Sequence, residues 1–230
     1  MMQILLWLLY GVTIYVTVFL LLVFLDDGEL RSEVEWLETW PDITLVIPAY
    51  NEEDSIGMTI DSCLSVDYPK DKMEVIVVDD GSSDRTAERA RTYEDNEIMT
   101  VISQENQGKG GALNTGLEEA SGEFMACVDA DSRIMEDALK NMVSEFDEDT
   151  GAIASAMKAY EPKNWIQNVQ WLEYMLGIFT RSIMSAIDAI HVTPGPLSVY
   201  RTQVIRDVGG FDEDSLVEDQ EICVRLQRNQ

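Results

Sequence analysis

The chain has 230 residues, of which 46% are hydrophobic, so it is long and apolar enough for a sizeable core and is not a disordered acidic tail. Its formal net charge of −27 excludes nucleic-acid binding through a general basic surface. The acidic residues are spread along the chain, and lysines are few. This composition is typical of halophilic proteins, which work in concentrated salt; an ordinary acidic surface is the alternative.

The first predicted element is a transmembrane helix over residues 1–25. Residues 2–25 carry no charge, and a run of that length can span a bilayer. A signal peptide would need a basic start, a shorter apolar core and a small-residue cleavage site, none of which is present. Residues 26–42 mix acidic residues with Trp36, Leu37 and Trp40, which predicts an interfacial linker to the membrane lipid.

Strand and helix patterns then alternate along the chain. Apolar, β-rich runs occupy 43–47, 74–78, 98–103 and 124–128. Helical patterns lie between and after them, near 52–65, 84–94, 109–120 and 135–146. Buried strands separated by helices predict an α/β fold with a mostly parallel central sheet flanked by helices on both faces.

The next predicted helix, over residues 164–190, places apolar side chains on one face at spacings of three and four. It is either a core helix or an amphipathic helix in the membrane interface, where its Trp and Tyr rings suit the headgroup level. PGPLSVY (194–200) and a short helix near 202–208 follow. The last predicted helix, 218–229, ends without a capping signal, and we expect the C-terminal part of the domain to be missing.

The three cysteines lack metal-binding spacing and lie in apolar surroundings, so we expect reduced core residues. Because His191 is the single histidine, any metal site must use oxygen ligands.

Polar clusters follow three of the predicted strands: PAYNEED (48–54), DDGSSDRT (79–86) and DADS (129–132). The carboxyl ends of parallel strands share one rim, where ligands bind, so these clusters should converge. Such carboxylates serve as helix N-caps, as we expect for Ser83 and Asp84, or they bind a hard cation. In Asp129-Ala130-Asp131, a Mg²⁺ or Mn²⁺ ion bound to a diphosphate would relieve the repulsion between the two aspartates.

Two further motifs are candidates for chemistry. In NQGKGGALN (106–114), a glycine-rich turn that enters a helix presents backbone N–H groups to phosphate, with Lys109 as a rare positive charge. A flexible turn is the alternative, and the motif is not a Walker P-loop. Glu218-Asp219 opens the last helix, either as an ordinary N-terminal charge pair or, if it faces the same rim, as a catalytic base.

Four segments together resemble the ordered motifs of family 2 glycosyltransferases: TLVIPAYNEEDSI, VIVVDDGSSDRT, NQGKGGALNTGLEEASGEFMACVDADS and GPLSVYRTQVIRDVGGFDEDSLVEDQE. The resemblance covers about residues 43–229. It implies a GT-A fold over 43–230 and inversion at the anomeric carbon. It also implies a nucleoside-diphosphate sugar as the donor, which we expect to be a UDP-sugar. With its membrane helix the chain looks like the membrane-embedded synthases of chitin, hyaluronan, cellulose and poly-N-acetylglucosamine.

The resemblance also assigns roles to residues. It implies that Glu218 and Asp219 are catalytic, with Asp219 as general base, and that Asp131 and Asp129 hold the Mg²⁺ or Mn²⁺ ion, Asp131 being favoured for direct contact. The implied donor-binding residues, around the nucleotide base and the diphosphate, are Pro48, Ala49, Tyr50, Glu52, Asp79, Asp80, Lys109 and Asp129.

Several alternatives stay open at this point. The acceptor is a growing polysaccharide or a glycolipid, or the enzyme transfers one sugar to a polyprenyl or dolichyl phosphate. The Q-x-x-R-W motif of processive synthases is absent from this sequence. A catalytically inactive nucleotide-binding or scaffold protein at the membrane is the alternative from another class. The resemblance places the protein in the cell membrane with its catalytic domain facing the cytoplasm.

Overall fold

The computed structural model describes residues 2–26, 35–157, 163–185, 196–213, 215 and 217–228. The chain divides into two compact units, residues 1–33 with 156–190 and residues 34–155 with 191–230. The first unit contains the helices α1 (Met2–Asp26) and α6 (Trp165–Ser185).

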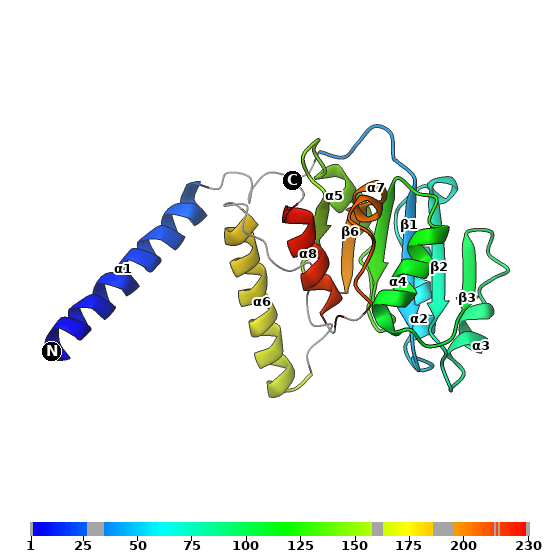
Figure 1. Cartoon of the computed structure of the whole chain (residues 1–230), viewed down its shortest axis with the longest axis horizontal. Coiled ribbons are helices and arrows are strands. Elements are labelled where there is room, and N and C mark those ends of the chain that lie inside the picture. Colours follow the sequence, from blue (N-terminus) through cyan, green and yellow to red (C-terminus); the bar gives the residue numbers. More distant parts are fainter. Residues whose placement is uncertain are drawn as a thin grey trace. The chain divides into compact units, whose positions relative to one another are not determined.

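The second unit contains a six-stranded sheet and its covering helices (Figure 1). Its strands are β1 (Ile43–Ala49), β2 (Met73–Asp79), β3 (Met99–Ser103), β4 (Phe124–Val128), β5 (Ala152–Ala154) and β6 (Leu197–Arg201). Its helices are α2 (Ile56–Ser65), a 3₁₀ turn (Lys70–Lys72), α3 (Thr86–Arg91), α4 (Gly108–Glu119), α5 (Ala138–Ser144), α7 (Thr202–Asp207) and α8 (Glu218–Arg228).

The strands lie in the order β3-β2-β1-β4-β6-β5. The first four strands in this order run parallel, which confirms the predicted mostly parallel sheet. β6 pairs antiparallel with β4, and β5 pairs antiparallel with β6. The sequence patterns did not predict these last two strands, so the expected sheet was incomplete at one edge.

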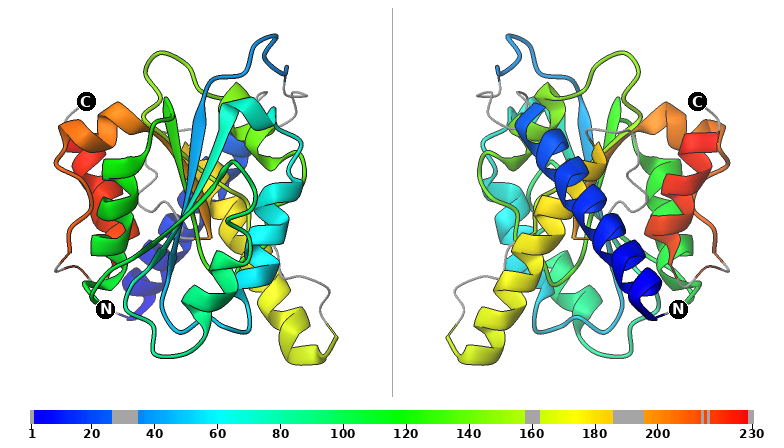
Figure 2. Two further views of the ribbon diagram at one scale, coloured as in Figure 1. Left: turned by 90° about the vertical axis from the view of Figure 1, so that its right-hand side faces the viewer. Right: turned by 90° about the vertical axis from the view of Figure 1, so that its left-hand side faces the viewer.

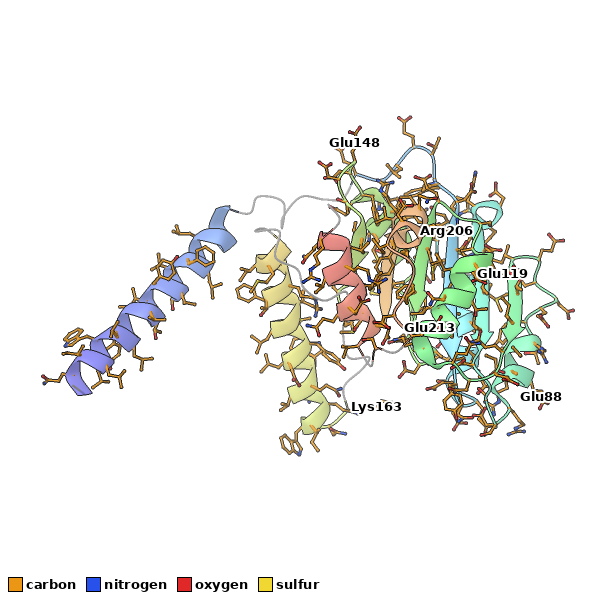
Figure 3. The ribbon with its side chains drawn as sticks, viewed as in Figure 1. Glu88, Glu119, Glu148, Lys163, Arg206 and Glu213 are labelled. Carbon is orange, nitrogen blue, oxygen red and sulfur yellow. The ribbon has the colours of Figure 1, made fainter. Side chains whose placement is uncertain are left out.

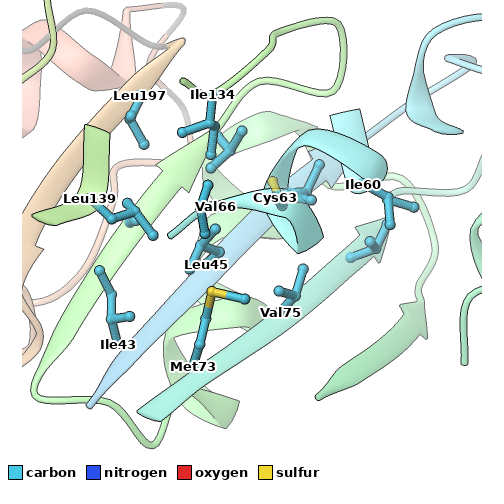
Figure 4. Packing of buried hydrophobic residues seen from close by; sticks show 14 of the residues in the cluster. Ile43, Leu45, Ile60, Cys63, Val66, Met73, Val75, Ile134, Leu139 and Leu197 are labelled. Atoms are coloured by element: carbon cyan, nitrogen blue, oxygen red, sulfur yellow. The ribbon is translucent and has the colours of Figure 1, made fainter. Parts of the chain in front are cut away.

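Helices cover both faces of the sheet (Figure 2). Because successive side chains of a strand point to opposite faces, each face of the sheet has its own apolar cluster against these helices. Leu45 and Ile47 pack with residues of α2 and α5, including Ile60 and Leu139, and Figure 4 shows part of this cluster. Val46 between them packs on the opposite face against α4, α7 and α8. The core therefore consists of two apolar layers, and it fixes the strand ends that carry the polar motifs.

Three observed helices, α2, α3 and α5, are shorter than the patterns predicted. The predicted helix over 52–65 begins only at Ile56, because residues 50–55 form a turn after β1. α3 covers 86–91 of the predicted 84–94, and α5 covers 138–144 of the predicted 135–146.

Two helices bear on the membrane predictions. Gln3–Leu22 of α1 has a mean hydropathy of 2.3 and is the one helix, among the described residues, long and apolar enough to cross a membrane. α6 occupies 165–185 of the predicted 164–190, and residues 186–190 lie outside the described part. Its side chains Trp165, Ile166 and Leu172 are exposed, as are Val169 and Leu176.

Candidate active site

The carboxyl ends of three parallel strands form one rim, as the sequence predicted. Ala49 at the end of β1 pairs with Asp79 at the end of β2, and the Asp80 N–H donates to the Ala49 carbonyl at 2.9 Å. On the other side of β1, Val46 pairs with Cys127, so Asp129 follows two residues beyond the ladder. The three polar clusters therefore begin at the same edge of the sheet.

The loops after β1 and β2 are bonded to each other. Asn51, with φ of +55°, donates its N–H to the Ser82 hydroxyl at 2.9 Å, and its side-chain oxygen accepts from the Ser83 N–H at 2.8 Å. The Glu52 N–H donates to the Thr86 hydroxyl at 2.7 Å. These bonds fix the segment that contains the predicted donor-binding residues Pro48, Ala49, Tyr50 and Glu52. Ala49 is buried, whereas Tyr50 is 51% exposed and free to contact a ligand.

The prediction that Ser83 and Asp84 cap a helix was wrong, because the cap residue of α3 is Arg85, which makes no side-chain cap bond. Asp84, one residue earlier, accepts from the Thr86 N–H at 2.9 Å and closes a local turn just before the helix. The Ser83 hydroxyl donates to the Asn51 side-chain oxygen at 3.1 Å, so it connects the two loops and does not cap α3.

Asp80 connects the rim to the glycine-rich turn. Its carboxylate is buried and accepts from the backbone N–H groups of Gln107 and Gly108 and from the Gln104 side chain, each at 2.8 Å. Asp79 is also buried and accepts from the Ser82 N–H at 3.3 Å. A carboxylate offers about four acceptor positions, and three of those of Asp80 are occupied within the protein.

The D-x-D turn directs its carboxylates away from the core. Ala130 is buried in the apolar cluster that contains Ile60, while Asp129 on one side is half-buried and Asp131 on the other is exposed. No group of three or more metal-ligating His, Cys, Asp or Glu residues occurs among the described residues. Two carboxylates without a third ligand fit a Mg²⁺ or Mn²⁺ ion that completes its shell with phosphate oxygens and water.

Lys109, on the first turn of α4, joins the D-x-D pair to the last helix. Its ammonium lies 2.7 Å from Asp129 Oδ1 and 3.1 Å from Glu218 Oε1. Burial lowers the pKa of this ammonium, but the charges and hydrogen bonds of Asp129 and Glu218 outweigh burial and raise the pKa above its ordinary value. Lys109 therefore remains positively charged at neutral pH between two motifs that are distant in sequence.

A narrow cavity lies beside this ion pair and includes Asp219. Its lining residues are Lys109, Leu113, Cys127, Ser198, Tyr200, Phe211, Glu218 and Asp219. Its volume of about 10 Å³ corresponds to one water molecule, so a sugar nucleotide would have to bind on the open rim outside it. The structure thus brings Lys109, Asp129, Glu218 and Asp219 together, with Asp131 exposed at the same turn.

The residues that hold α8 and the loop before it in place, Asn114 and Arg225, are not among the predicted site residues. The Asn114 side chain accepts from the Phe211 N–H at 2.7 Å and donates to the Phe211 carbonyl at 2.9 Å. From α8, Arg225 donates to the carbonyls of Val208 and Gly210 at 2.9 and 2.8 Å. The one sequence feature that could have drawn attention to Asn114 is that it is a polar residue inside the glycine-rich motif. No local sequence pattern marks Arg225.

Comparison with known proteins identifies this arrangement. The sequence profile described as Glycosyl transferase family 2 matches residues 44–209, which include the rim and the D-x-D turn. The chain belongs to glycosyltransferase family 2. The membership of family 2 predicted from the four motifs, and the GT-A fold, are therefore confirmed.

Among curated family 2 relatives, the poly-β-1,6-N-acetyl-D-glucosamine synthase of Staphylococcus aureus (strain MSSA476) is 33% identical over 189 residues, which are 80% of this chain and 45% of the relative. The synthase of Staphylococcus epidermidis is 32% identical over 201 residues, which are 85% of this chain and 47% of the relative. The chain thus spans less than half the length of these relatives.

Solved structures show the same fold. The mannosyltransferase PcManGT from Pyrobaculum calidifontis, in complex with GDP-Man and Mn²⁺, matches with a TM-score of 0.68 and 27% identity over 90% of this chain and 59% of that chain. S. aureus TarS 1-349, in complex with UDP-GlcNAc, matches with a TM-score of 0.61 and 26% identity over 80% of this chain and 53% of that chain.

Proposed function

We propose that the chain carries the donor site and the general base of a membrane-anchored, inverting glycosyltransferase. Its donor is a UDP-sugar, UDP-N-acetylglucosamine by the names of its relatives, and its acceptor is a hydroxyl of a growing polysaccharide or glycolipid. The observation that carries the proposal is the Lys109 ammonium, which contacts both the D-x-D aspartate Asp129 and Glu218.

The reaction follows from the roles of these groups. An acceptor hydroxyl attacks the anomeric carbon from the face opposite the diphosphate, and Asp219 takes the hydroxyl proton as the new C–O bond forms. The bond from the anomeric carbon to the phosphate oxygen breaks, and its electron pair leaves with the nucleoside diphosphate. Such general-base assistance contributes roughly 10²–10⁴-fold to the rate.

The leaving group is a diphosphate, so the site needs positive charge. Lys109 supplies one charge from the chain itself, and the backbone N–H groups at the start of α4 lie beside it. Asp129 and Asp131 would hold a Mg²⁺ or Mn²⁺ ion, which when bound neutralises charge on the leaving diphosphate. On the opposite side of the rim, Tyr50, Glu52 and Asp80 would contact the nucleotide base.

The membrane placement belongs to the same proposal. α1 has the length and composition of a spanning helix, and the exposed apolar side chains of α6 suit the lipid interface. Residues 26–42 would then lead from the membrane to the catalytic domain. The domain faces the cytoplasm, where the nucleotide sugar is made.

The test is binding of UDP, GDP, CDP and ADP by the full chain, measured by calorimetry with and without Mn²⁺ in concentrated KCl. We expect UDP to bind best and to require Mn²⁺ for binding. We expect Asp131→Asn to lose this Mn²⁺-dependent binding of UDP. Asp207→Asn, on the exposed surface of α7, is the matched control and should bind as the parent does. Preference for GDP would replace the donor with GDP-mannose, the ligand named for the P. calidifontis relative. No nucleotide binding by the folded chain would contradict the proposal.

A further inference from the structure

The D-x-D turn follows the end of β4 at Val128, which still pairs with Leu197 of β6 although the β1–β4 ladder has ended at the pair Val46 and Cys127. Beyond that point its backbone has few partners: the Asp129 N–H donates to the Pro196 carbonyl at a long 3.4 Å, and the Ser132 N–H donates back to the Asp129 carbonyl at 3.0 Å. Strand pairing therefore does not determine the direction of the residue between the two aspartates.

A side chain from α2 holds that residue. Thr59 is 0% exposed, and its hydroxyl donates to the Ala130 carbonyl at 2.7 Å. The Ala130 methyl group is itself buried in the apolar cluster on the α2 side of the sheet. Ala130 is thus fixed through its carbonyl and through its side chain. Because Ala130 lies inside the turn that the Ser132 N–H closes onto the Asp129 carbonyl, fixing Ala130 also constrains the aspartates on either side of it.

Two more bonds fasten the same loop to α2 and to the residues just after it. One turn along α2, the Ser62 hydroxyl accepts from the Ile134 N–H at 3.2 Å and donates to the Thr59 carbonyl at 2.8 Å. The Asp67 N–H donates to the Glu136 carbonyl at 2.8 Å. The segment from Asp129 to Glu136 therefore takes its position from α2.

We propose that Thr59 is a positioning residue for the D-x-D pair: its hydrogen bond to the Ala130 carbonyl sets the direction of Asp129 and Asp131 and thereby the affinity for the divalent cation. The inference rests on the proposed function, in which this pair holds the cation. Without the hydroxyl, the buried carbonyl loses its donor, and the turn rotates to find another partner. Groups that orient metal ligands typically change metal affinity by 10–100-fold when mutated.

The test is Thr59→Val, which keeps the branched shape and removes the hydroxyl. Free Mn²⁺ is measured by electron paramagnetic resonance while the full chain is titrated in the presence of UDP. We expect the apparent Kd for Mn²⁺ to rise roughly tenfold or more. Thr59→Ser, which restores the hydroxyl, should bring the Kd back close to the parent value.

Thr44→Val is the matched control, because Thr44 is also a 0% exposed threonine whose hydroxyl bonds two groups, Glu74 at 2.8 Å and the Gly122 N–H at 3.0 Å. It lies near the start of β1, at the opposite end of that strand from the rim. We expect Thr44→Val to lower the melting temperature and to leave the Mn²⁺ affinity unchanged. An equal loss of Mn²⁺ affinity in Thr44→Val would overturn the inference, because general destabilisation would then explain both variants.

The outcomes separate this inference from the proposed function. If the parent binds Mn²⁺ and Thr59→Val binds it equally well, Thr59 has no positioning role and the proposed function stands. If the parent binds no Mn²⁺ with UDP, both fail. If Thr59→Val does not fold, the milder Ser62→Ala variant replaces it, and an unchanged Mn²⁺ affinity there refutes the anchoring of the turn by α2.

Discussion

At the scale of single residues, the site depends on a few charges held at short range. Lys109 contacts Asp129 and Glu218, and Asp219 follows at the start of α8 in the same cavity. These three carboxylates and one ammonium leave a net negative charge at the site. A divalent cation bound at the D-x-D pair would therefore offset the negative charge of the protein's own carboxylates, even before the donor diphosphate binds.

The proposed base gives the first prediction. Asp219→Asn keeps the size of the side chain and removes its ability to accept a proton, so we expect transfer to fall by roughly 10²–10⁴-fold. Calorimetric binding of UDP with Mn²⁺ should stay near the parent value, because Lys109, Asp129 and Asp131 are untouched. Asp207→Asn serves as the control with unchanged transfer. Loss of nucleotide binding together with transfer would assign Asp219 to the donor site and not to proton transfer.

The cysteines give the second prediction. None of the three is in a disulfide and all three are buried, as the sequence predicted, and burial raises the pKa of the Cys63 and Cys127 thiols to about 12. The pKa of Cys223 is raised by burial and by the charge of Asp219. At pH 8 a thiol of pKa 12 is ionised in roughly one molecule in 10⁴. A disulfide reagent should therefore react slowly with the native chain, whereas in the unfolded chain it should react with all three thiols.

The same pKa shifts set the direction of a pH effect on stability. The unfolded thiols ionise near pH 8.5, whereas the native thiols remain protonated, so above that pH the native state binds more protons. The free energy of unfolding should therefore be insensitive to the thiols below about pH 8 and should fall as the pH rises from about 8.5 towards 12. Urea unfolding across this range measures the slope. A thiol that reacts at the rate of free cysteine in the folded chain would contradict the assigned burial.

Residue roles could be predicted from the sequence only where local pattern determines them. The positions of Asp80 and Asp129 at one edge of the sheet follow from the rule that parallel strands end at one rim. Thr59 and Asn114 are not predictable in this way, since their importance comes from carbonyls and N–H groups far along the chain. For a similar reason the predicted caps at Ser83 and Asp84 were wrong: Ser83 bonds the distant Asn51 side chain, and Asp84, one residue before the Arg85 cap position, bonds the Thr86 N–H.

At the scale of elements, four strands were predictable because each contains an apolar, β-rich run; β1, β2 and β4 are almost wholly buried, whereas β3 at the edge of the sheet is only partly buried. β6 was missed because LSVYR mixes polar with apolar residues and is not a continuous apolar run, and β5 was missed because it has only three residues. Both strands pair antiparallel with partners distant in sequence. Such pairing is decided by tertiary contacts, which a local pattern does not contain.

The contact between α4 and β1 gives the third prediction. A Cβ on Gly116 would lie 2.3 Å from a methyl carbon of Val46, so this glycine allows the helix to approach the sheet closely. We expect Gly116→Ala to lower stability by about 1–3 kcal/mol. The melting temperature should fall by roughly 2–4 °C for each kcal/mol.

Gly177→Ala is the control for that prediction, because it makes the same substitution inside α6. There the added Cβ would meet only an Arg181 side-chain nitrogen at 3.6 Å, so we expect unchanged or slightly higher stability. Equal melting temperatures for Gly116→Ala and the parent would show that α4 can move away from β1 without cost.

At the scale of the whole molecule, the surface charge dominates. The formal net charge is −27, from 43 acidic and 16 basic residues, and the acidic residues lie on many elements. Figure 3 shows Glu88, Glu119 and Glu148 pointing outward from α3, from the end of α4 and from the segment before β5, and all three are exposed. Self-repulsion of this size destabilises the folded state when salt is low.

The fourth prediction is that salt stabilises the folded chain. The screening length falls from about 10 Å at 0.1 M salt to about 3 Å at 1 M, which shortens the range of repulsion below the spacing of most surface charges. We therefore expect the melting temperature, measured by calorimetry in detergent, to rise steadily between about 0.1 and 1 M KCl. Sucrose at equal osmolality is the control, because it lacks ions and cannot screen charge. A melting temperature that rises equally in sucrose would trace the effect to solvent exclusion, and one that is flat in KCl would mean that the surface is an ordinary acidic one.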